Sequence, residues 1–101
     1  MAHPLVEIRE PGRPPWQLVV RDSVDVGRAC QGVNLMDPEV SRRHLTLRNQ
    51  RGQVTVRDVG STNGTTVNGL PIRDETVLAP GDVVGLGQVT IVVLPGEGSR
   101  G

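Results

Sequence analysis

The 101-residue sequence has no phenylalanine, no tyrosine and no lysine, and it contains a single tryptophan and a single cysteine. With Trp16 as the only aromatic residue, valine and leucine must fill the core. A valine-rich core favours strands, because branched side chains pack well on a pleated sheet and lose rotamer freedom in a helix. The lone Cys30 excludes an intrachain disulfide and gives no sign of an oxidising compartment.

Excess charge and long apolar runs are also absent. The sequence has 11 basic and 11 acidic residues, so no overall field attracts it to nucleic acid or to an anionic membrane. No stretch reaches the length of a membrane span, and the N-terminus lacks the basic and apolar regions of a signal peptide. We therefore expect a cytoplasmic protein that binds neither membrane nor nucleic acid and is a monomer in isolation.

The length suits one domain, which we place at residues 1–95, followed by a small, polar and flexible tail at residues 96–101. Thirteen glycines and eight prolines separate short runs in which apolar and polar residues alternate. The predicted strands contain Val6 and Ile8; Trp16, Leu18 and Val20; Val24 and Val26; Leu45 and Leu47; Val54 and Val56; residues 83–86; and residues 89–94. Many short strands at this spacing are typical of an all-β sandwich or barrel.

Two local patterns refine this prediction. Residues 39–51 place Val40, His44 and Leu47 at helical spacing, but the alternation at Leu45 and Leu47 and the weak helix propensity of their neighbours favour a loop followed by a strand. The pair Asn68-Gly69 lies between two short apolar runs and predicts a tight hairpin turn, because both residues tolerate positive φ.

Four motifs lie in the predicted loops: Gly27-Arg28, Ser41-Arg42-Arg43-His44, Gly60-Ser61-Thr62-Asn63-Gly64 and Asn68-Gly69. Because successive strands of a sandwich run back and forth, the first three motifs should gather at one end of the molecule. That end would present a guanidinium, hydroxyl groups, an amide and glycine-rich backbone. This set of donors suits a phosphate anion.

The order of these motifs resembles that of the forkhead-associated (FHA) family. The resemblance spans residues 24–72 with distinctive residues, and the strand pattern extends it over nearly the whole chain. It implies an all-β sandwich of two sheets and about eleven strands, with a phosphothreonine peptide bound by loops at one end. The domain would then mediate phosphorylation-dependent protein–protein interaction in Ser/Thr kinase signalling, with a phosphothreonine-containing partner, an upstream Ser/Thr protein kinase and no catalysis.

The resemblance also implies five contacts with the phosphopeptide. Arg28 would clamp the phosphate, Ser41 would donate its hydroxyl to it, and Arg42 would lie close to the phosphate or the peptide backbone. Thr62 would add a further phosphate contact, and Asn63 would hold the peptide main chain. The family further implies a preference for threonine over serine, through a small apolar notch for the methyl group.

Four further residues would support the site, again by resemblance. Gly27 and Gly64 would permit tight backbone, His44 would brace the loop that carries Ser41, and Asn68 would be a loop brace. No metal or cofactor is expected. In the loop before Ser41, the acidic residues Asp37 and Glu39 predict selection against acidic residues C-terminal to the phosphothreonine.

Other interpretations rest on the same residues. An enzyme would pair Ser41 with His44 as nucleophile and base, but their spacing is poor for that geometry and no acid is evident to orient the imidazole. A nucleic-acid protein would need Arg42, Arg43, Arg48 and Arg51 as a basic patch, against the neutral charge and the lack of stacking aromatics. The alternative left open is a phosphate-independent scaffold that uses a sheet face or edge.

Overall fold

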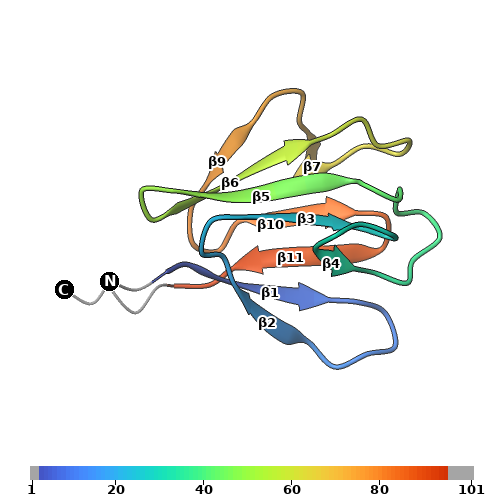
Figure 1. Cartoon of the computed structure of the whole chain (residues 1–101), viewed down its shortest axis with the longest axis horizontal. Coiled ribbons are helices and arrows are strands. Elements are labelled where there is room, and N and C mark those ends of the chain that lie inside the picture. Colours follow the sequence, from blue (N-terminus) through green and yellow to red (C-terminus); the bar gives the residue numbers. More distant parts are fainter. Residues whose placement is uncertain (1–2, 96–101) are drawn as a thin grey trace.

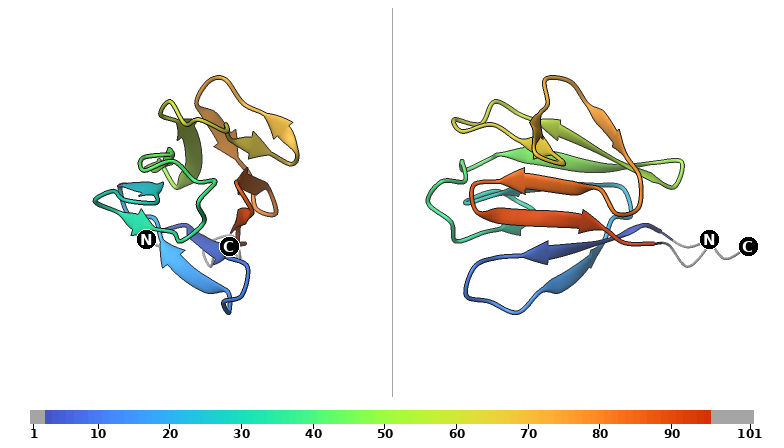
Figure 2. Two further views of the ribbon diagram at one scale, coloured as in Figure 1. Left: turned by 90° about the vertical axis from the view of Figure 1, so that its right-hand side faces the viewer. Right: turned by 180° about the vertical axis from the view of Figure 1, so that it is seen from behind.

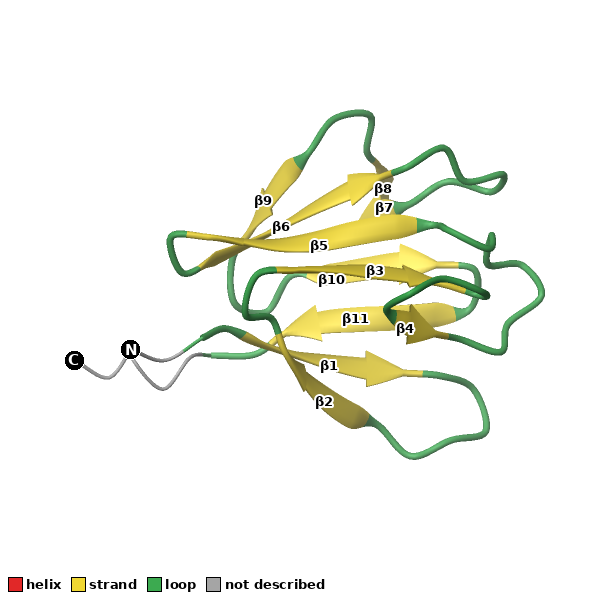
Figure 3. Cartoon of the chain, in the orientation of Figure 1, coloured by secondary structure: helices red, strands yellow, loops and turns green. Residues whose placement is uncertain are grey.

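The computed structural model describes residues 3–95, which form eleven β-strands and no helix (Figures 1 and 3). The strands are β1 (Leu5–Arg9), β2 (Trp16–Val19), β3 (Ser23–Gly27), β4 (Val33–Asn34), β5 (Leu45–Gln50), β6 (Gln53–Asp58), β7 (Thr66–Val67), β8 (Leu70–Pro71), β9 (Thr76–Leu78), β10 (Val83–Leu86) and β11 (Val89–Val93). The described residues therefore contain no helix that is long and apolar enough to cross a membrane.

The strands form two sheets that pack face to face, with the order β2-β1-β11-β10-β7-β8 in one sheet and β4-β3-β5-β6-β9 in the other. The pairings are antiparallel except that of β3 with β4, which is parallel. The right-hand view of Figure 2 shows the β1-β11-β10 sheet in front of the second sheet. The predicted two-sheet sandwich is confirmed.

The core between the sheets is aliphatic, as the composition requires. Among the described residues, the buried hydrophobic side chains are valine, leucine or isoleucine, and they come from the inward positions of both sheets. The register pairs Ile8 with Ile91 in one sheet and Leu47 with Val56 in the other. Trp16 packs against this core while remaining partly exposed.

The antiparallel order of β3, β5 and β6 determines where the predicted motifs lie. The loop after β3, the loop before β5 and the loop after β6 leave the same end of their sheet. These loops lie together at the right of Figure 1, and the left-hand view of Figure 2 looks onto this end. The prediction that the first three motifs share one end is confirmed.

Several local predictions can be compared with the structure. Residues 39–51 form a loop followed by β5, as predicted, and β7 and β8 form the predicted hairpin. Its turn has positive φ at both residues, 52° at Asn68 and 84° at Gly69. The short strands β4 and β9 are not among the runs that alternation identified. The predicted tail at residues 96–101 lies outside the described residues.

The β7–β8 turn supplies a test of the fold. The Asn68 side chain donates from Nδ2 to Asp82 Oδ1 at 3.1 Å and accepts the Val83 N–H at 3.0 Å. Asn68→Ala removes both bonds and leaves an alanine at positive φ, so we expect a loss of about 1–3 kcal/mol in unfolding free energy, measured by urea denaturation. Asn68→Gly loses the same two bonds, but glycine adopts positive φ without strain, so its unfolding free energy should fall by less than that of Asn68→Ala. Equal losses in both variants would show that alanine is not strained at this position.

Candidate functional site

A pocket of about 300 Å³ opens between the loops at this end of the sandwich. Its lining residues are Arg28, Pro38, Glu39, Val40, Ser41, Arg42, Thr62 and Asn63. All five residues that the sequence predicted as phosphopeptide contacts are in this set. They come from three separate loops, after β3, before β5 and after β6, and the fold brings them together.

Arg28 is anchored to the neighbouring loop by its own backbone and by its guanidinium. Its N–H donates to the Ser41 carbonyl at 2.9 Å, and its Nε donates to the Val40 carbonyl at 2.9 Å. The Nε contact orients the guanidinium, and the exposed side chain lines the pocket. A planar fork of N–H donors held in this way suits bidentate binding of a phosphate.

Ser41 joins the second loop to the third. Its Oγ accepts the backbone N–H of Thr62 at 2.9 Å. Because the hydroxyl oxygen is the acceptor in this bond, its proton stays available as a donor to a ligand. The contact also fixes the position of Thr62 in the pocket wall.

His44 lies beneath these loops and is fully buried. Its Nδ1 accepts the Ser41 N–H at 3.0 Å, and its Nε2 lies 2.7 Å from the Gly64 carbonyl oxygen. Since a backbone N–H can only donate, Nδ1 must be unprotonated and Nε2 carries the proton that it donates to Gly64. The ring therefore ties the loop before β5 to the loop after β6.

Asn63 bonds the same two loops from the exposed side. Its Nδ2 donates to the Glu39 carbonyl at 2.8 Å, which leaves Oδ1 as an acceptor that can face a peptide N–H. The next residue, Gly64, has φ of 86°, a conformation that favours glycine. Its N–H donates to Ser61 Oγ at 2.9 Å, which closes the turn.

Gly27 lies where the backbone of β3 closely approaches that of the loop before β5. A Cβ at this position would be 2.1 Å from the Arg42 carbonyl oxygen, so only glycine fits. Two residues later, the Ala29 N–H donates to the same Arg42 carbonyl at 3.0 Å. The exposed Arg42 side chain lines the pocket, while its main chain is fixed by this contact.

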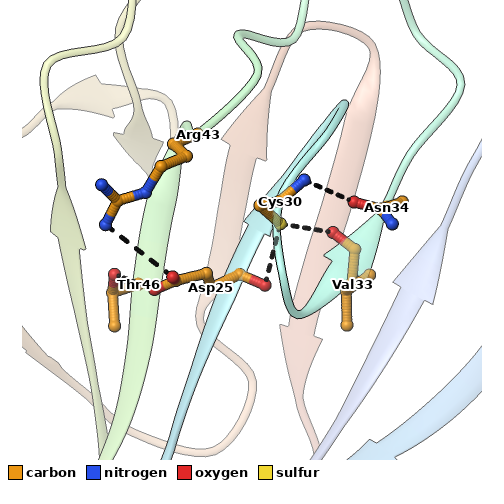
Figure 4. Close-up of polar contacts among 6 residues, drawn as sticks. All are labelled: Asp25, Cys30, Val33, Asn34, Arg43 and Thr46. Atoms are coloured by element: carbon orange, nitrogen blue, oxygen red, sulfur yellow. Dashed lines mark hydrogen bonds and ion pairs between the residues drawn. The ribbon is translucent and has the colours of Figure 1, made fainter.

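Cys30 and Arg43 are not among the residues that line the pocket, and Figure 4 shows their polar contacts. The Cys30 Sγ lies 3.5 Å from the Asp25 carbonyl and 3.3 Å from the Val33 carbonyl, and its N–H donates to Asn34 Oδ1 at 2.8 Å. These bonds shape the loop that follows Arg28. Arg43 reaches along the outer sheet face toward the Asp25 carboxylate at 3.8 Å.

Asn68 is not brought to this group. Its side chain bonds to Asp82 and Val83 at the start of β10, so it braces a different loop from those that line the pocket. The resemblance implied that Asn68 is a loop brace in support of the site; these bonds show it bracing the start of β10, and a role in the site itself stays a prediction.

Asp58 is a supporting residue that the sequence prediction missed. At the end of β6, its Oδ1 accepts the N–H groups of Gly60 and Ser61 at 2.8 Å each, and its Oδ2 accepts the hydroxyls of Ser61 at 2.5 Å and Thr65 at 2.7 Å. Partial burial would raise the pKa of this carboxyl, but the hydrogen bonds prevail and lower it from 3.8 to about 2. An aspartate two residues before a glycine is a turn signal that could have identified it.

The charge of the pocket favours an anion. Arg28 and Arg42 supply two guanidinium groups against the single carboxylate of Glu39, and Ser41 and Thr62 supply hydroxyls. Within residues 3–95, no group of three His, Cys, Asp or Glu side chains is arranged to hold a metal ion. The arrangement can bind a tetrahedral oxyanion through charge-assisted hydrogen bonds.

Comparison with known proteins gives a consistent family match. A sequence model described as the FHA domain matches residues 24–87. The oxoglutarate dehydrogenase inhibitor of Corynebacterium diphtheriae is 41% identical over 93 residues, which cover 91% of this chain and 64% of that protein. The glycogen accumulation regulator GarA of Mycolicibacterium smegmatis is 49% identical over 65 residues, covering 64% of this chain and 40% of the regulator. The chain thus spans less than two thirds of these relatives' length.

Solved structures give the same match at the level of the fold. One comes from a structural and functional analysis of phosphothreonine-dependent FHA domain interactions, with a TM-score of 0.77, 36% identity, and coverage of 91% of this chain and 95% of the other. Another is the FhaA FHA domain complexed with the intracellular domain of Rv3910, with a TM-score of 0.75, 37% identity, and coverage of 89% and 98%.

The lowered pKa of Asp58 predicts a pH-dependent contribution to stability. A carboxylate with a folded-state pKa near 2 and an ordinary value of 3.8 stabilises the folded chain above about pH 4, and the contribution is lost as the pH falls toward 2. Allowing for solvent screening, we expect Asp58→Asn to cost about 1–2 kcal/mol at pH 7, measured by urea denaturation.

The difference between wild type and variant should shrink from pH 4 to pH 2. Taking this difference removes the parallel effects of Glu75 and Asp82, whose pKa values are lowered by hydrogen bonds from the Thr55 hydroxyl and the Ala79 N–H. A difference that stays constant over this range would show that the Asp58 charge does not stabilise the turn.

Proposed function

The chain belongs to the FHA domain family, and we propose that the pocket at its loop end binds phosphothreonine through Arg28, Ser41, Arg42 and Thr62, with Asn63 on the peptide main chain. The observation that carries this proposal is the convergence of these five side chains on one pocket of about 300 Å³. Residues 1–95 would act as one binding domain, with an FHA domain's phosphothreonine-dependent interaction as its activity.

The donors match the ligand in number and charge. Phosphothreonine carries about −1.5 to −2 charges and three acceptor oxygens at neutral pH. Hydrogen bonds to such a group contribute about 1.5–3 kcal/mol each, so three or four of them give roughly 5–10 kcal/mol before the cost of ordering the peptide. We expect a dissociation constant on the order of micromolar.

The loops are positioned before any ligand arrives. The Arg28 guanidinium is oriented by Val40, the Ser41 hydroxyl by the Thr62 N–H, and the Asn63 amide by Glu39. Binding then requires little ordering of the protein, which preserves the gain from the phosphate contacts. This preorganisation supports a dedicated anion site rather than a chance cluster of polar side chains.

The hydrogen bonds of His44 support a site that binds its ligand without catalysis. Both ring nitrogens are engaged with backbone groups, of Ser41 and of Gly64, and neither faces the Ser41 hydroxyl. A nucleophile and its general base must lie within hydrogen-bond reach of each other. The Ser41–His44 pair lacks that contact, so we propose a binding module and not an enzyme.

The partner would be a protein phosphorylated on threonine by a Ser/Thr protein kinase. Among the relatives, the FhaA FHA domain has been solved with the intracellular domain of another protein, which supports a protein partner. We further propose that the domain acts in the cytoplasm as a monomer and independently of nucleic acid, consistent with its zero net charge.

Arg28→Ala tests the function. It removes the guanidinium that would hold the phosphate, so we expect the dissociation constant for a phosphothreonine peptide, measured by isothermal titration calorimetry, to rise about 100-fold. Arg28→Lys keeps the charge but loses the planar fork and should recover only part of the affinity.

Arg73→Ala is a matched control, because Arg73 is exposed and lies outside the pocket. It should bind as wild type does. Wild-type affinity in Arg28→Ala would show that Arg28 does not bind the phosphate. Equal binding of the unphosphorylated peptide would favour the phosphate-independent scaffold over the phosphothreonine module.

The threonine preference is a separate prediction. If the pocket wall accommodates the threonine methyl group, a phosphoserine peptide of otherwise identical sequence should bind more weakly, by about 1 kcal/mol or roughly fivefold, because one buried methyl group is lost. Fluorescence anisotropy with the two labelled peptides measures the ratio. Equal affinities would mean that the site recognises the phosphate alone.

A further inference from the structure

Thr62 is the one exposed threonine among residues 3–95, and it lines the pocket of about 300 Å³ described above, here called the phosphate pocket. The other threonines are half-buried or buried. Four of them donate their hydroxyls to neighbouring oxygens: Thr46, Thr55, Thr65 and Thr76. Within the described part of the chain, no hydrogen bond engages the Thr62 hydroxyl, although its backbone N–H donates to Ser41 Oγ at 2.9 Å. Thr62 therefore presents an unbonded hydroxyl to solvent at the wall of the pocket.

The hydroxyl groups near Thr62 in the same loop are already engaged. Ser61 donates its hydroxyl to Asp58 Oδ2, and its Oγ accepts the Gly64 N–H at 2.9 Å. Thr65 is buried and donates to the same carboxylate oxygen at 2.7 Å. A Ser/Thr kinase that acts on this loop would therefore find the hydroxyl of Thr62 accessible, and not those of its neighbours.

Thr62 shares the phosphate pocket with two guanidinium groups, those of Arg28 and Arg42. A short series of bonds connects it with Arg28: the Thr62 N–H donates to Ser41 Oγ, and the Ser41 carbonyl accepts the Arg28 N–H, each at 2.9 Å. A phosphate attached to a side chain adds about −1.5 to −2 charges and forms charge-assisted hydrogen bonds with nearby arginines. The pocket that suits the phosphate of a ligand therefore also suits a phosphate carried by its own wall.

We propose that Thr62 is a phosphorylation site and that its phosphate occupies the phosphate pocket, which blocks the domain from within. This rests on the phosphothreonine function proposed above. In the modification, Thr62 Oγ1 attacks the terminal phosphorus of a nucleoside triphosphate held by a Ser/Thr kinase. The P–Oγ1 bond forms, the bond to the β-phosphate oxygen breaks, the nucleoside diphosphate leaves, and the hydroxyl proton passes to the catalytic base of the kinase.

The attached phosphate would compete with the phosphopeptide. A group tethered beside its binding site acts at an effective concentration of about millimolar or more, which exceeds the dissociation constant on the order of micromolar expected for the peptide. The attached phosphate lacks the peptide main chain that Asn63 would hold, so its own binding is the weaker of the two. We therefore expect phosphorylation of Thr62 to weaken the binding of a phosphothreonine peptide about tenfold or more.

The deciding experiment compares the unmodified domain with one that carries phosphothreonine at position 62, installed during translation by codon suppression. Isothermal titration calorimetry with one phosphothreonine peptide gives both dissociation constants, and that of the phosphorylated domain should be higher by about tenfold or more. The control carries phosphoserine at Ser23, which is exposed and lies at the far end of β3 from Arg28. Its affinity should equal that of the unmodified domain, whereas equal affinities in all three proteins overturn the proposal.

A second measurement shows whether the attached phosphate lies in the pocket or only repels the ligand. Phosphorus NMR follows the second pKa of the phosphate on Thr62, and guanidinium groups beside it should hold that pKa below its value in the urea-unfolded chain. Arg28→Ala should reverse most of this lowering, and Arg28→Lys, which keeps the charge, should retain part of it. A pKa equal to that in the unfolded chain would place the phosphate in solvent and overturn occupancy of the pocket, even if peptide binding were lost.

The access of a kinase to Thr62 is tested separately. A Ser/Thr kinase domain is first selected that phosphorylates a synthetic peptide of residues 57–67 at Thr62, and the folded domain is then given to it with ATP. Mass spectrometry should find phosphate on Thr62 and none on Ser61 or Thr65, whose hydroxyls are bonded to Asp58. A folded domain that stays unmodified would show that the fold shields Thr62, and the proposed modification would be wrong.

These outcomes are separable from those of the function on which the proposal rests. If the unmodified domain binds no phosphothreonine peptide, the proposed function fails, while the phosphorus NMR and kinase measurements still test the site at Thr62. If the unmodified and phosphorylated domains bind the peptide equally well, the phosphothreonine function stands and the self-blocking phosphate is overturned.

Discussion

The phosphate pocket depends on one buried side chain that holds two loops in register. His44 accepts the Ser41 N–H with one ring nitrogen and donates to the Gly64 carbonyl with the other, at full burial. Each bond satisfies a backbone group that would otherwise be left without a partner near the core, where that loss is expensive. The positions of Ser41 and of the turn at Thr62 and Asn63 therefore follow from the orientation of a single imidazole.

Gly27 and Asp58 further restrict the conformation of the loops that His44 connects. Gly27 lets β3 approach the backbone of Arg42, which brings Arg28 within reach of the Val40 carbonyl. Asp58 organises the turn after β6 from the other side through four accepted hydrogen bonds. The proposed phosphate donors are thus held in place by bonds between the loops, an arrangement that would give affinity without a large ordering cost.

Much of this could be predicted from the sequence, and the failures have physical causes. Alternating valines and leucines identify the longer strands, because each strand has one face in the core. The two-residue β4 and three-residue β9 are too short to show a period, and β4 pairs in parallel with a strand reached through a loop. The loop motifs predict residues that line one pocket, but the side-chain partners of Asn68 depend on contacts between distant segments that no local pattern encodes.

The claim that three loops converge on one phosphate is tested most directly by a crystal structure of the domain with a phosphothreonine peptide. We predict phosphate oxygens within about 3 Å of the terminal nitrogens of Arg28 and of Ser41 Oγ, with Thr62 at the same anion. We also predict that the His44 bonds to Ser41 and Gly64 persist unchanged on binding. A peptide bound along a sheet face or edge, with its phosphate in solvent and the pocket empty, would contradict it.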